Sequence, residues 1–343
     1  MVLNTAWVHA QVEKTKKISK SYSVNGSTAL NIENKFGKVH INTNNGNTIK
    51  VDVTMIGRAN NDAKAQRILD KLQVNVSGEN EISFRTSVIS GIRSTRRMKR
   101  NSSRSFEVNY LISMPKNVKL KVRNRYGNVF LGDYSGELDM YVAYGSIKAG
   151  KIENPQDKKI KVAFGTLDID NIDRGELNVT YGTLKLDNAR QVQLTNNFSS
   201  IDINRVKTLD LKSKYGKLQV ATVDNISGSS KFDRLNIGLL NNNCKLVMTY
   251  AKGFAVNKVN KNFQKIDIDG KFSAMEFKFE NGASFDYELN TQFAKVNSIL
   301  LKNTKIRKHI EKANSSYYSG KLGNGNNKSK VTIKSKYGTV RIK

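Results

Sequence analysis

Apolar and polar residues alternate through much of the second half of the chain. In residues 181–220 the apolar positions pair up as Leu184 and Leu186, Val192 and Leu194, Ile201 and Ile203, Leu209 and Leu211, and Leu218 and Val220. A polar residue (Lys, Asp or Gln) stands between the two members of each pair. This period of two is typical of strands with one buried and one solvated face. The pattern therefore predicts many short strands that share one core.

A dipeptide of an aromatic and a small residue separates these strands at a nearly constant interval. Its aromatic members are Tyr126, Tyr144, Phe164, Tyr181, Phe198, Tyr215, Phe232 and Tyr250, and the interval widens slightly at Phe272 and Phe293. A period of this size is too short for a helical repeat or a propeller blade. We therefore expect an all-β fold, a parallel β-helix (β-solenoid) with about two short strands in each 17–22-residue coil.

Stacking of equivalent coils would place the recurring rings one strand spacing apart, about 4.8 Å. We expect these rings to form a structural ladder along one edge of the core, because aligned aromatic side chains pack well. The small residue after each ring, glycine in most repeats, is expected to supply the positive φ of a tight bend. The alternative is that the rings form a platform for a ligand or cofactor.

The regions outside the regular repeats differ in pattern. Residues 15–115 read as a β-rich capping region, with one helix at about 61–72 (NDAKAQRILDKL) and further strands on either side of it. Residues 116–343 form the predicted solenoid. A polar, Gly- and Asn-rich excursion at about 301–330 precedes a last copy of the motif at Tyr337-Gly338. We expect that copy to close the stack.

The first fourteen residues stand apart from both regions. Met1–Ala10 (MVLNTAWVHA) resembles the end of a signal peptide, with small or apolar residues before a polar stretch. The alternative is an ordinary disordered N-terminus. The first interpretation implies export to the periplasm, the outer-membrane surface or the exterior.

The charge of the chain is strongly basic. It has 58 Lys and Arg against 29 Asp and Glu among 343 residues, a formal net charge of +29. Such a field attracts polyanions. One stretch without a strand pattern, 91–104, concentrates six basic side chains: Arg93, Arg96, Arg97, Lys99, Arg100 and Arg104. We interpret it as a candidate polyanion-binding loop, with a solvated hairpin loop as the alternative.

Residues typical of catalysis or metal binding do not converge in the sequence. The single cysteine, Cys244, shares strand parity with Leu246 and Met248, so it is expected to be a buried core thiol. The three histidines have no metal-ligand spacing, and no nucleophile or phosphate-binding motif occurs. We therefore predict no catalytic residue, no metal site and no cofactor.

Several segments together resemble a known family. NKFGKVHIN, VNYLISMPKNVKLKVRNRYGNVFLGDYSG, the serial YGTL and YGKL repeats and the closing SKVTIKSKYGTVRIK are similar to adhesin-like parallel β-helix proteins of Gram-negative envelopes, known as auto-transporter adhesin head (GIN-type) domains or domains of unknown function. The resemblance covers about residues 15–343. It implies a parallel β-helix, export, and a role in adhesion or envelope maintenance. The family supplies no catalytic residues.

These observations lead to one main functional hypothesis and two alternatives. The main hypothesis is a non-enzymatic, exported scaffold that binds an anionic polysaccharide, lipopolysaccharide or another polyanion through its basic surface. The first alternative is a polysaccharide-active lyase or glycosidase, which would need carboxylates gathered on one face, as at Asp168, Asp170, Asp173 and Asp202. The second is an envelope protein that binds a protein partner. Charge alone also leaves nucleic acid open as a ligand.

Overall fold

The computed structural model describes residues 11–89, 105–153, 158–298, 305–323 and 328–343. Its fold is all-β, with mostly parallel strands and one short helix. The chain forms two compact units, residues 1–150 and 151–343. Within the described residues, no helix is both long and apolar enough to cross a membrane.

In its described residues, the first unit holds ten strands, one helix and the start of an eleventh strand. The elements are β1 (Val12–Ser23), β2 (Ala29–Lys35), β3 (Val39–Asn44), β4 (Thr48–Ala59), α1 (Asp62–Leu69), β5 (Leu72–Ser77), β6 (Glu81–Val88), β7 (Ser105–Pro115), β8 (Lys119–Arg125), β9 (Val129–Leu131), β10 (Leu138–Ala143) and β11 (Ile147–Ile152). Strand β4 pairs antiparallel with β1 on one side and with β7 on the other. Strand β3 pairs in parallel with both β7 and β9.

Helix α1 is shorter than the 61–72 expected, and it packs on β4 and β1. The Asn61 side chain caps it by accepting a hydrogen bond from the Lys64 amide at 2.9 Å. Ala65 and Leu69 are its buried residues. The sheet approaches the helix closely at Gly57, where an added Cβ would lie 2.7 Å from the Ala65 carbonyl oxygen. Leu72, which was expected to end the helix, is instead the first residue of β5.

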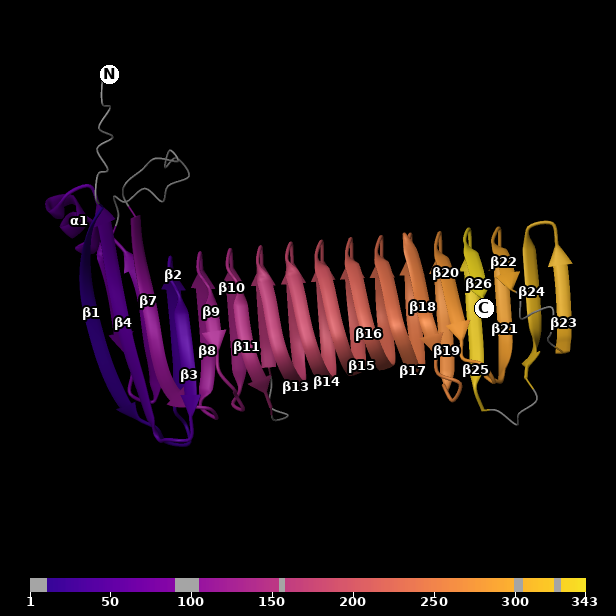
Figure 1. Ribbon diagram of the computed structural model, residues 1–343, viewed down its shortest axis with the longest axis horizontal. Coiled ribbons are helices and arrows are strands. Elements are labelled where there is room, and N and C mark those ends of the chain that lie inside the picture. The colour runs from indigo at the N-terminus through magenta and orange to yellow at the C-terminus, as the bar shows by residue number, and fades with distance from the viewer. Residues whose placement is uncertain (1–10, 90–104, 154–157, 299–304, 324–327) are drawn as a thin grey trace, which may run out of the picture. The chain divides into compact units, whose positions relative to one another are not determined.

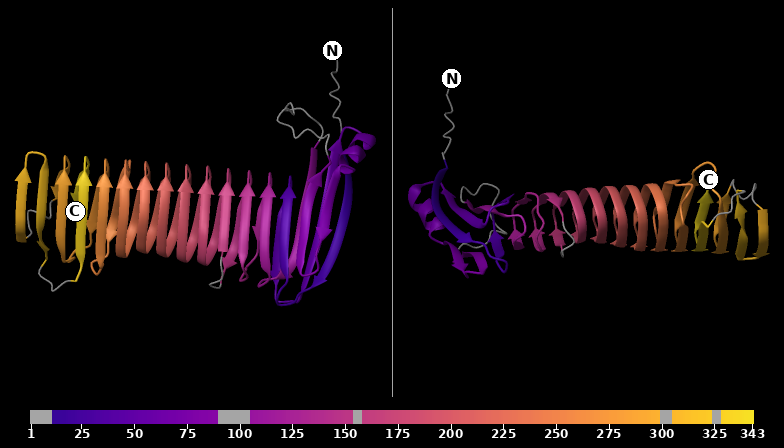
Figure 2. Two further views of the ribbon diagram at one scale, coloured as in Figure 1. Left: turned by 180° about the vertical axis from the view of Figure 1, so that it is seen from behind. Right: turned by 90° about the horizontal axis from the view of Figure 1, so that it is seen from below.

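The second unit holds the remaining strands. They are β12 (Lys158–Ala163), β13 (Thr166–Thr180), β14 (Thr183–Asn197), β15 (Ser200–Lys214), β16 (Lys217–Lys231), β17 (Arg234–Thr249), β18 (Gly253–Val259), β19 (Lys265–Lys271), β20 (Ala274–Phe279), β21 (Phe285–Gln292), β22 (Lys295–Ser298), β23 (Lys305–Lys312), β24 (Ser315–Leu322), β25 (Lys330–Lys336) and β26 (Thr339–Ile342). The arrows of β13–β17 point the same way in Figures 1 and 2.

Successive repeats of the second unit pair in parallel at a constant offset. Leu184 of β14 lies beside Leu167 of β13 on one side and beside Ile201 of β15 on the other. We use the word repeat for the segment from one aromatic residue of the recurring dipeptide to the next. From β13 to β17 the two short strands expected in each repeat join into one longer, continuous strand. The pairing skips Asp170 and Asp173 in β13, where the strand turns within the repeat.

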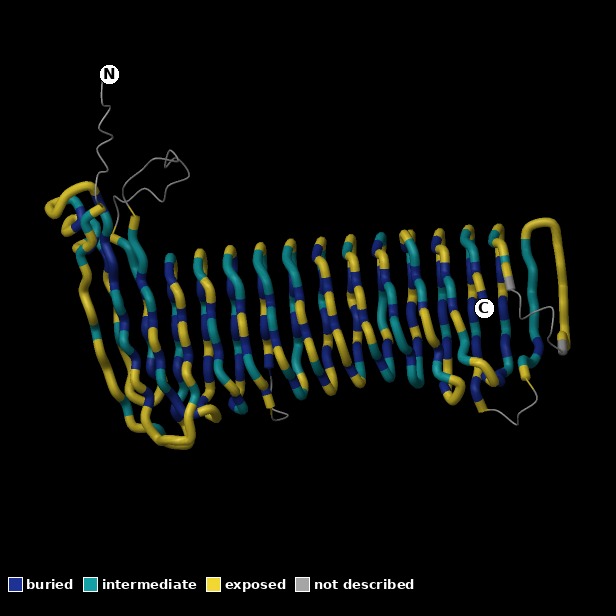
Figure 3. The backbone as a smooth tube through the Cα atoms, viewed as in Figure 1, coloured by how far each residue is buried: buried dark blue, intermediate teal, exposed yellow. Residues whose placement is uncertain are grey.

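The core follows the predicted alternation. All ten apolar residues that define the sequence pattern in 181–220 are buried, with exposures of 0–2 %. Cys244 is also buried, as expected, and burial raises the pKa of its thiol. Figure 3 shows the resulting alternation of buried and exposed positions along β14 and β15.

The C-terminal strands do not close the stack as expected. β25 pairs in parallel with β19 on one side and with β21 on the other. β26 lies in the same way between β20 and β22 (yellow in Figure 1). The described part of the predicted excursion is the antiparallel hairpin β23–β24, and β24 pairs with β21.

Candidate functional site: a column of exposed aromatic rings

The recurring aromatic side chains of the second unit stack into one column, which we call the ring column. Neighbouring ring centroids lie 4.6–5.1 Å apart and their planes are 3–8° from parallel. In stacked order the members are Phe164, Tyr181, Phe198, Tyr215, Phe232, Tyr250, Phe272, Tyr337 and Phe293. Phenylalanine and tyrosine therefore alternate throughout the column. The alternation depends on Tyr337, which β25 and β26 insert between Phe272 and Phe293.

The expectation that these rings line the core is wrong. Eight of the nine are 42–51 % exposed, and Phe232 is half-buried. Every residue of the column has a positive φ, between 49° and 57°. This left-handed conformation bends the chain and interrupts the alternation of faces, so the aromatic side chain points outward and the next residue points inward. Positive φ was expected at the small residue, but the aromatic residue adopts it.

The small residue is needed for space. A Cβ added at Gly182 would lie 2.3 Å from the carbonyl oxygen of Gly165 in the preceding repeat. Where serine occupies this position, its side chain makes a hydrogen bond inside the bend. Ser199 Oγ accepts from the Gly182 amide at 3.1 Å, and Ser273 Oγ accepts from the Ala251 amide at 3.1 Å.

Stacking determines which part of each ring meets solvent. A left-handed conformation costs a non-glycine residue roughly 1–2 kcal/mol. A stacked aromatic pair contributes about 0.5–1.5 kcal/mol beyond its area burial, so the two contacts of an interior ring offset that cost. Because neighbouring rings occupy both faces, the column presents ring edges to solvent. The edge of an aromatic ring carries partial positive charge. The column is therefore suited to oxygen-rich or anionic groups.

The first unit has a shorter stack of the same kind. Tyr126 stacks on Phe36 at 5.1 Å and on Tyr144 at 5.0 Å. Phe36 also meets Phe106 edge-on at 4.9 Å. Tyr126 and Tyr144 are 46–47 % exposed, so the core position expected for these two residues is wrong as well.

Basic residues flank the ring column on both sides. Those just before or after a ring of the column, all without an ion pair to a carboxylate within the described residues, are Lys214, Lys217, Lys231, Arg234, Lys252, Lys271, Lys295 and Lys336. The Lys336 ammonium lies 5.5 Å from the centroid of the Tyr337 ring.

Tyr215 and Phe232 each have one basic residue directly before them and another two positions after them, and we call these four residues the basic cluster. Lys214 lies directly beside Lys231, and Lys217 lies beside Arg234, so two pairs of like charges face each other on adjacent strands. All four side chains are exposed. Like charges in this position repel each other and destabilise the pairing. The buried Asp233 carboxylate is the acidic group inside this bend.

The basic loop predicted from the sequence lies outside the described residues, as does Met1–Ala10. That loop comprises Arg93, Arg96, Arg97, Lys99, Arg100 and Arg104, and its role in binding polyanions stays a prediction.

Basic residues lie among the carboxylates of the candidate acidic patch. The Arg190 guanidinium donates two hydrogen bonds to Asp173, and the bonded guanidinium lowers the pKa of that carboxyl. Lys185 lies between Asp168 and Asp202 in the parallel register. Among the described residues, no group of three or more His, Cys, Asp or Glu side chains is placed to hold a metal ion.

A groove on the sheet of the first unit is a weaker candidate. Lys17, Lys38, His40, Asp52 and Leu111 are among the residues that line it. Ser19 Oγ donates to Asp52 at 2.6 Å, and this hydrogen bond is the main cause of the lowered pKa of the Asp52 carboxyl. Since cations, an anion and an apolar side chain are mixed in the lining, the groove favours no single class of ligand.

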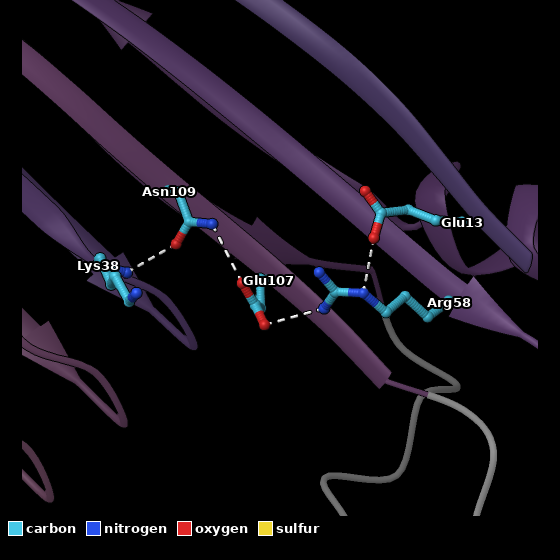
Figure 4. A network of polar contacts seen from close by, with 5 residues as sticks. All are labelled: Glu13, Lys38, Arg58, Glu107 and Asn109. Carbon is cyan, nitrogen blue, oxygen red and sulfur yellow. Dashed lines mark hydrogen bonds and ion pairs between the residues drawn. The ribbon is translucent and has the colours of Figure 1, made fainter. Parts of the chain in front are cut away.

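A polar network joins strands of the same unit (Figure 4). Arg58 bonds to Glu13 and Glu107, each at 2.8 Å. Asn109 donates to Glu107 at 3.1 Å and accepts from the Lys38 amide at 2.8 Å. The Asn109 bond, followed by Arg58, lowers the pKa of Glu107. Because these groups bind one another, we interpret the network as structural.

The basic cluster was not predicted from the sequence, although the sequence contains a repeated pattern that indicates it. Lys214, Lys217, Lys231 and Arg234 recur at the same offsets from two successive aromatic residues, Tyr215 and Phe232. The uniform spread of lysine along the chain concealed this local repetition. The motif predicted that Tyr337 belongs to the stack, but its place between Phe272 and Phe293 had no signal in the sequence, because it depends on which distant strands pair.

Comparisons with known proteins identify no family. No protein-family model and no curated protein matches the chain. Among solved structures, a candidate cell adhesion protein from Clostridium sporogenes shares 13 % identity, with 96 % of this chain and 99 % of that chain covered and a TM-score of 0.20. Candidate adhesins from Parabacteroides distasonis and Bacteroides fragilis share 12 % and 11 %, each covering 96 % of this chain and 97 % of the other, with TM-scores of 0.38 and 0.28.

Proposed function

We propose that the chain is a non-enzymatic, exported scaffold, adhesin-like in the sense of the resemblance above, that binds an anionic polymer of the cell envelope or its surroundings. In this proposal the parallel repeats of the second unit form a β-solenoid. Its outer surface presents the ring column and the flanking basic residues. The ligand runs along that surface and makes many weak ionic contacts.

The observation that carries the proposal is the pairing of Lys214 with Lys231 and of Lys217 with Arg234. Adjacent like charges without carboxylate partners reduce the stability of the free protein. An anion placed over them would remove this repulsion and gain attraction from all four groups. The net charge of +29 would add long-range attraction for a polyanion.

The test is binding of the full chain to heparin and to lipopolysaccharide at several salt concentrations. Binding that depends on ionic interactions weakens steeply with salt, and the logarithm of the affinity falls linearly with the logarithm of the salt concentration. Changing Lys214→Gln together with Lys231→Gln should reduce that slope by about one for each basic side chain that bound the polyanion.

A matched control is available in the same unit. Arg205→Gln with Lys207→Gln removes two exposed positive charges at the turn within the repeat, away from the rings. The control should keep the wild-type slope. Affinity that is independent of salt, or an equal loss in both double variants, would contradict a binding surface at the basic cluster.

The enzymatic alternative has less support. Arg190 binds Asp173, and Lys185 lies between Asp168 and Asp202, so basic groups offset the negative charge of the carboxylates that a lyase or glycosidase would use. Incubation with anionic glycans, followed by analysis of chain length, tests this alternative directly. Shortened glycan products would overturn the assignment as a binding scaffold.

A further inference from the structure

The ring column has a regular spacing of tyrosine residues that can specify the ligand more closely than the basic cluster does. Its tyrosine residues occupy every second position, so phenol hydroxyl groups recur at twice the strand spacing, about 10 Å. Within the described residues, the hydroxyl groups of Tyr181, Tyr215 and Tyr250 have no hydrogen-bond partner in the protein. All three rings are 45–51 % exposed. The hydroxyl groups are therefore available to a ligand at a regular interval.

We propose that the ring column binds an extended linear polysaccharide in which an acidic sugar alternates with a neutral one. One sugar would lie over each ring, and the tyrosine hydroxyl groups would bind the same kind of sugar in every second repeat. This inference rests on the proposed function and specifies its ligand.

The spacing of the repeats matches such a chain. Neighbouring rings are separated by about one strand spacing of 4.8 Å, which is close to the length of one sugar in an extended, equatorially linked polysaccharide. The ligand would therefore stay in register with the column over several repeats. A polymer with a charge on every unit would gain nothing from the alternation of phenylalanine and tyrosine.

The chemistry of the ring edges supports the same ligand. The positively polarised edges and the tyrosine hydroxyl groups both attract carboxylate and hydroxyl oxygens. Lys214 and Lys231 on one side, and Lys217 and Arg234 on the other, add charge complementarity to a carboxylate. A second copy of this chain is a poorer occupant, because it would bring the same basic residues against these ones.

The test compares three polyanions of matched length. Hyaluronan alternates an acidic with a neutral sugar, polygalacturonate carries a carboxylate on every sugar, and polyphosphate has charge without sugars. Wild-type protein should bind hyaluronan more tightly than its charge density predicts. Affinity for hyaluronan oligomers should rise with each added disaccharide, because each one engages a further tyrosine.

The decisive variant is Tyr181→Phe with Tyr215→Phe and Tyr250→Phe. It keeps the rings and the basic residues and removes only three hydroxyl groups. We expect a loss of at least about tenfold in affinity for hyaluronan, because three hydrogen bonds to the ligand are removed. Binding of polyphosphate should change less than about twofold. Tyr317→Phe, in β24 and outside the column, is the control and should leave both affinities unchanged.

The outcomes separate this inference from the proposed function. If the triple variant binds hyaluronan as tightly as wild type, the ring column does not recognise an alternating glycan, while salt-dependent binding of heparin still supports the scaffold. Binding of hyaluronan no tighter than its charge density predicts would also overturn this inference. If wild-type protein binds none of these polyanions at low salt, the proposed function itself is wrong. Thermal unfolding of each variant checks that the column remains intact.

Discussion

The side chain of Asp233 accepts a hydrogen bond from the backbone amide of Gly216, in the preceding repeat, at 2.6 Å. The carboxylate is fully buried, and it also accepts from Ser230 Oγ at 2.7 Å and from the Lys231 amide at 3.0 Å. A buried donor left without a partner is costly. This carboxylate therefore joins two successive repeats directly beneath the basic cluster.

Asp233→Ala should lower the free energy of unfolding by about 2–4 kcal/mol, because it leaves three donors, among them the buried Ser230 hydroxyl, without their acceptor. Asp233→Ser should recover part of the loss, since serine already accepts the equivalent amide hydrogen bond at Ser199 and Ser273. Denaturant unfolding of the two variants measures the difference. Equal loss in both would show that the amide hydrogen bond is not the main contribution.

Gly182→Ala should destabilise the protein by about 1–3 kcal/mol, the usual cost of overpacking. Its new Cβ would lie 2.3 Å from a backbone oxygen of the preceding repeat, so the strands would have to move apart. Gly253→Ala is the matched control, because no atom lies within 4 Å of a Cβ at that position. The control should be neutral or slightly stabilising in thermal unfolding, and similar losses in both variants would contradict the close approach.

Phe198→Gly should be less destabilising than Phe198→Ala by about 1 kcal/mol. Both variants remove the stacking of this ring on Tyr181 and Tyr215, at 4.9 and 4.6 Å. Only glycine adopts the left-handed conformation, φ 53° at this residue, without a steric cost. Chemical denaturation of the pair separates ring stacking from backbone strain. A more stable alanine variant would show that the bend does not require positive φ.

The first unit should lose stability in alkaline solution through Tyr110. Burial raises the pKa of Tyr110 to about 12. The Thr86 hydroxyl donates to Asn34, so Tyr110 donates to Thr86, over 2.7 Å. Below about pH 10 the tyrosine is protonated in both the folded and the unfolded states. Above it only the unfolded state ionises, so stability falls between about pH 10 and 12.

Tyr110→Phe should reduce the decrease in the free energy of unfolding at alkaline pH by up to about 2 kcal/mol, because phenylalanine cannot ionise. Tyr134, whose pKa burial also raises, remains in the variant and continues to contribute. Tyr126→Phe removes a half-exposed hydroxyl group from the same unit and is the control. Urea unfolding at pH 8, 10 and 11 gives the comparison, and an unchanged pH dependence in Tyr110→Phe would refute this assignment.

Local alternation of residues was sufficient to predict most of the core. Leu184 and Leu186, or Ile201 and Ile203, are buried because a strand places every second side chain on the same face. The constant interval between aromatic residues likewise predicted that equivalent residues would lie side by side. The prediction holds where the repeats have nearly equal lengths. In that case strand pairing places the same position of each repeat beside its equivalent in the next repeat.

The direction of the rings could not be deduced in this way. Leu194 and Asn196 are buried, so the alternation along a strand predicts that Phe198 is buried too. The left-handed backbone conformation of Phe198 instead turns its side chain toward solvent. The positive φ depends on how the whole bend packs. The small residues Gly182 and Ser199 occupy the interior of the bend, so the aromatic residue before each of them must point outward. The expected conformation was therefore assigned to the wrong member of the dipeptide.

The amino-acid sequence alone determined the all-β character, the buried apolar positions and the period of the repeat, because these depend on residues close together in the chain. Only the tertiary structure decided that the aromatic edges face solvent and that Lys214, Lys217, Lys231 and Arg234 gather around two rings. It also placed Tyr337 between Phe272 and Phe293, which completes the alternation of the column. Strand pairing between distant segments sets these neighbours, and no local pattern records which segments will pair.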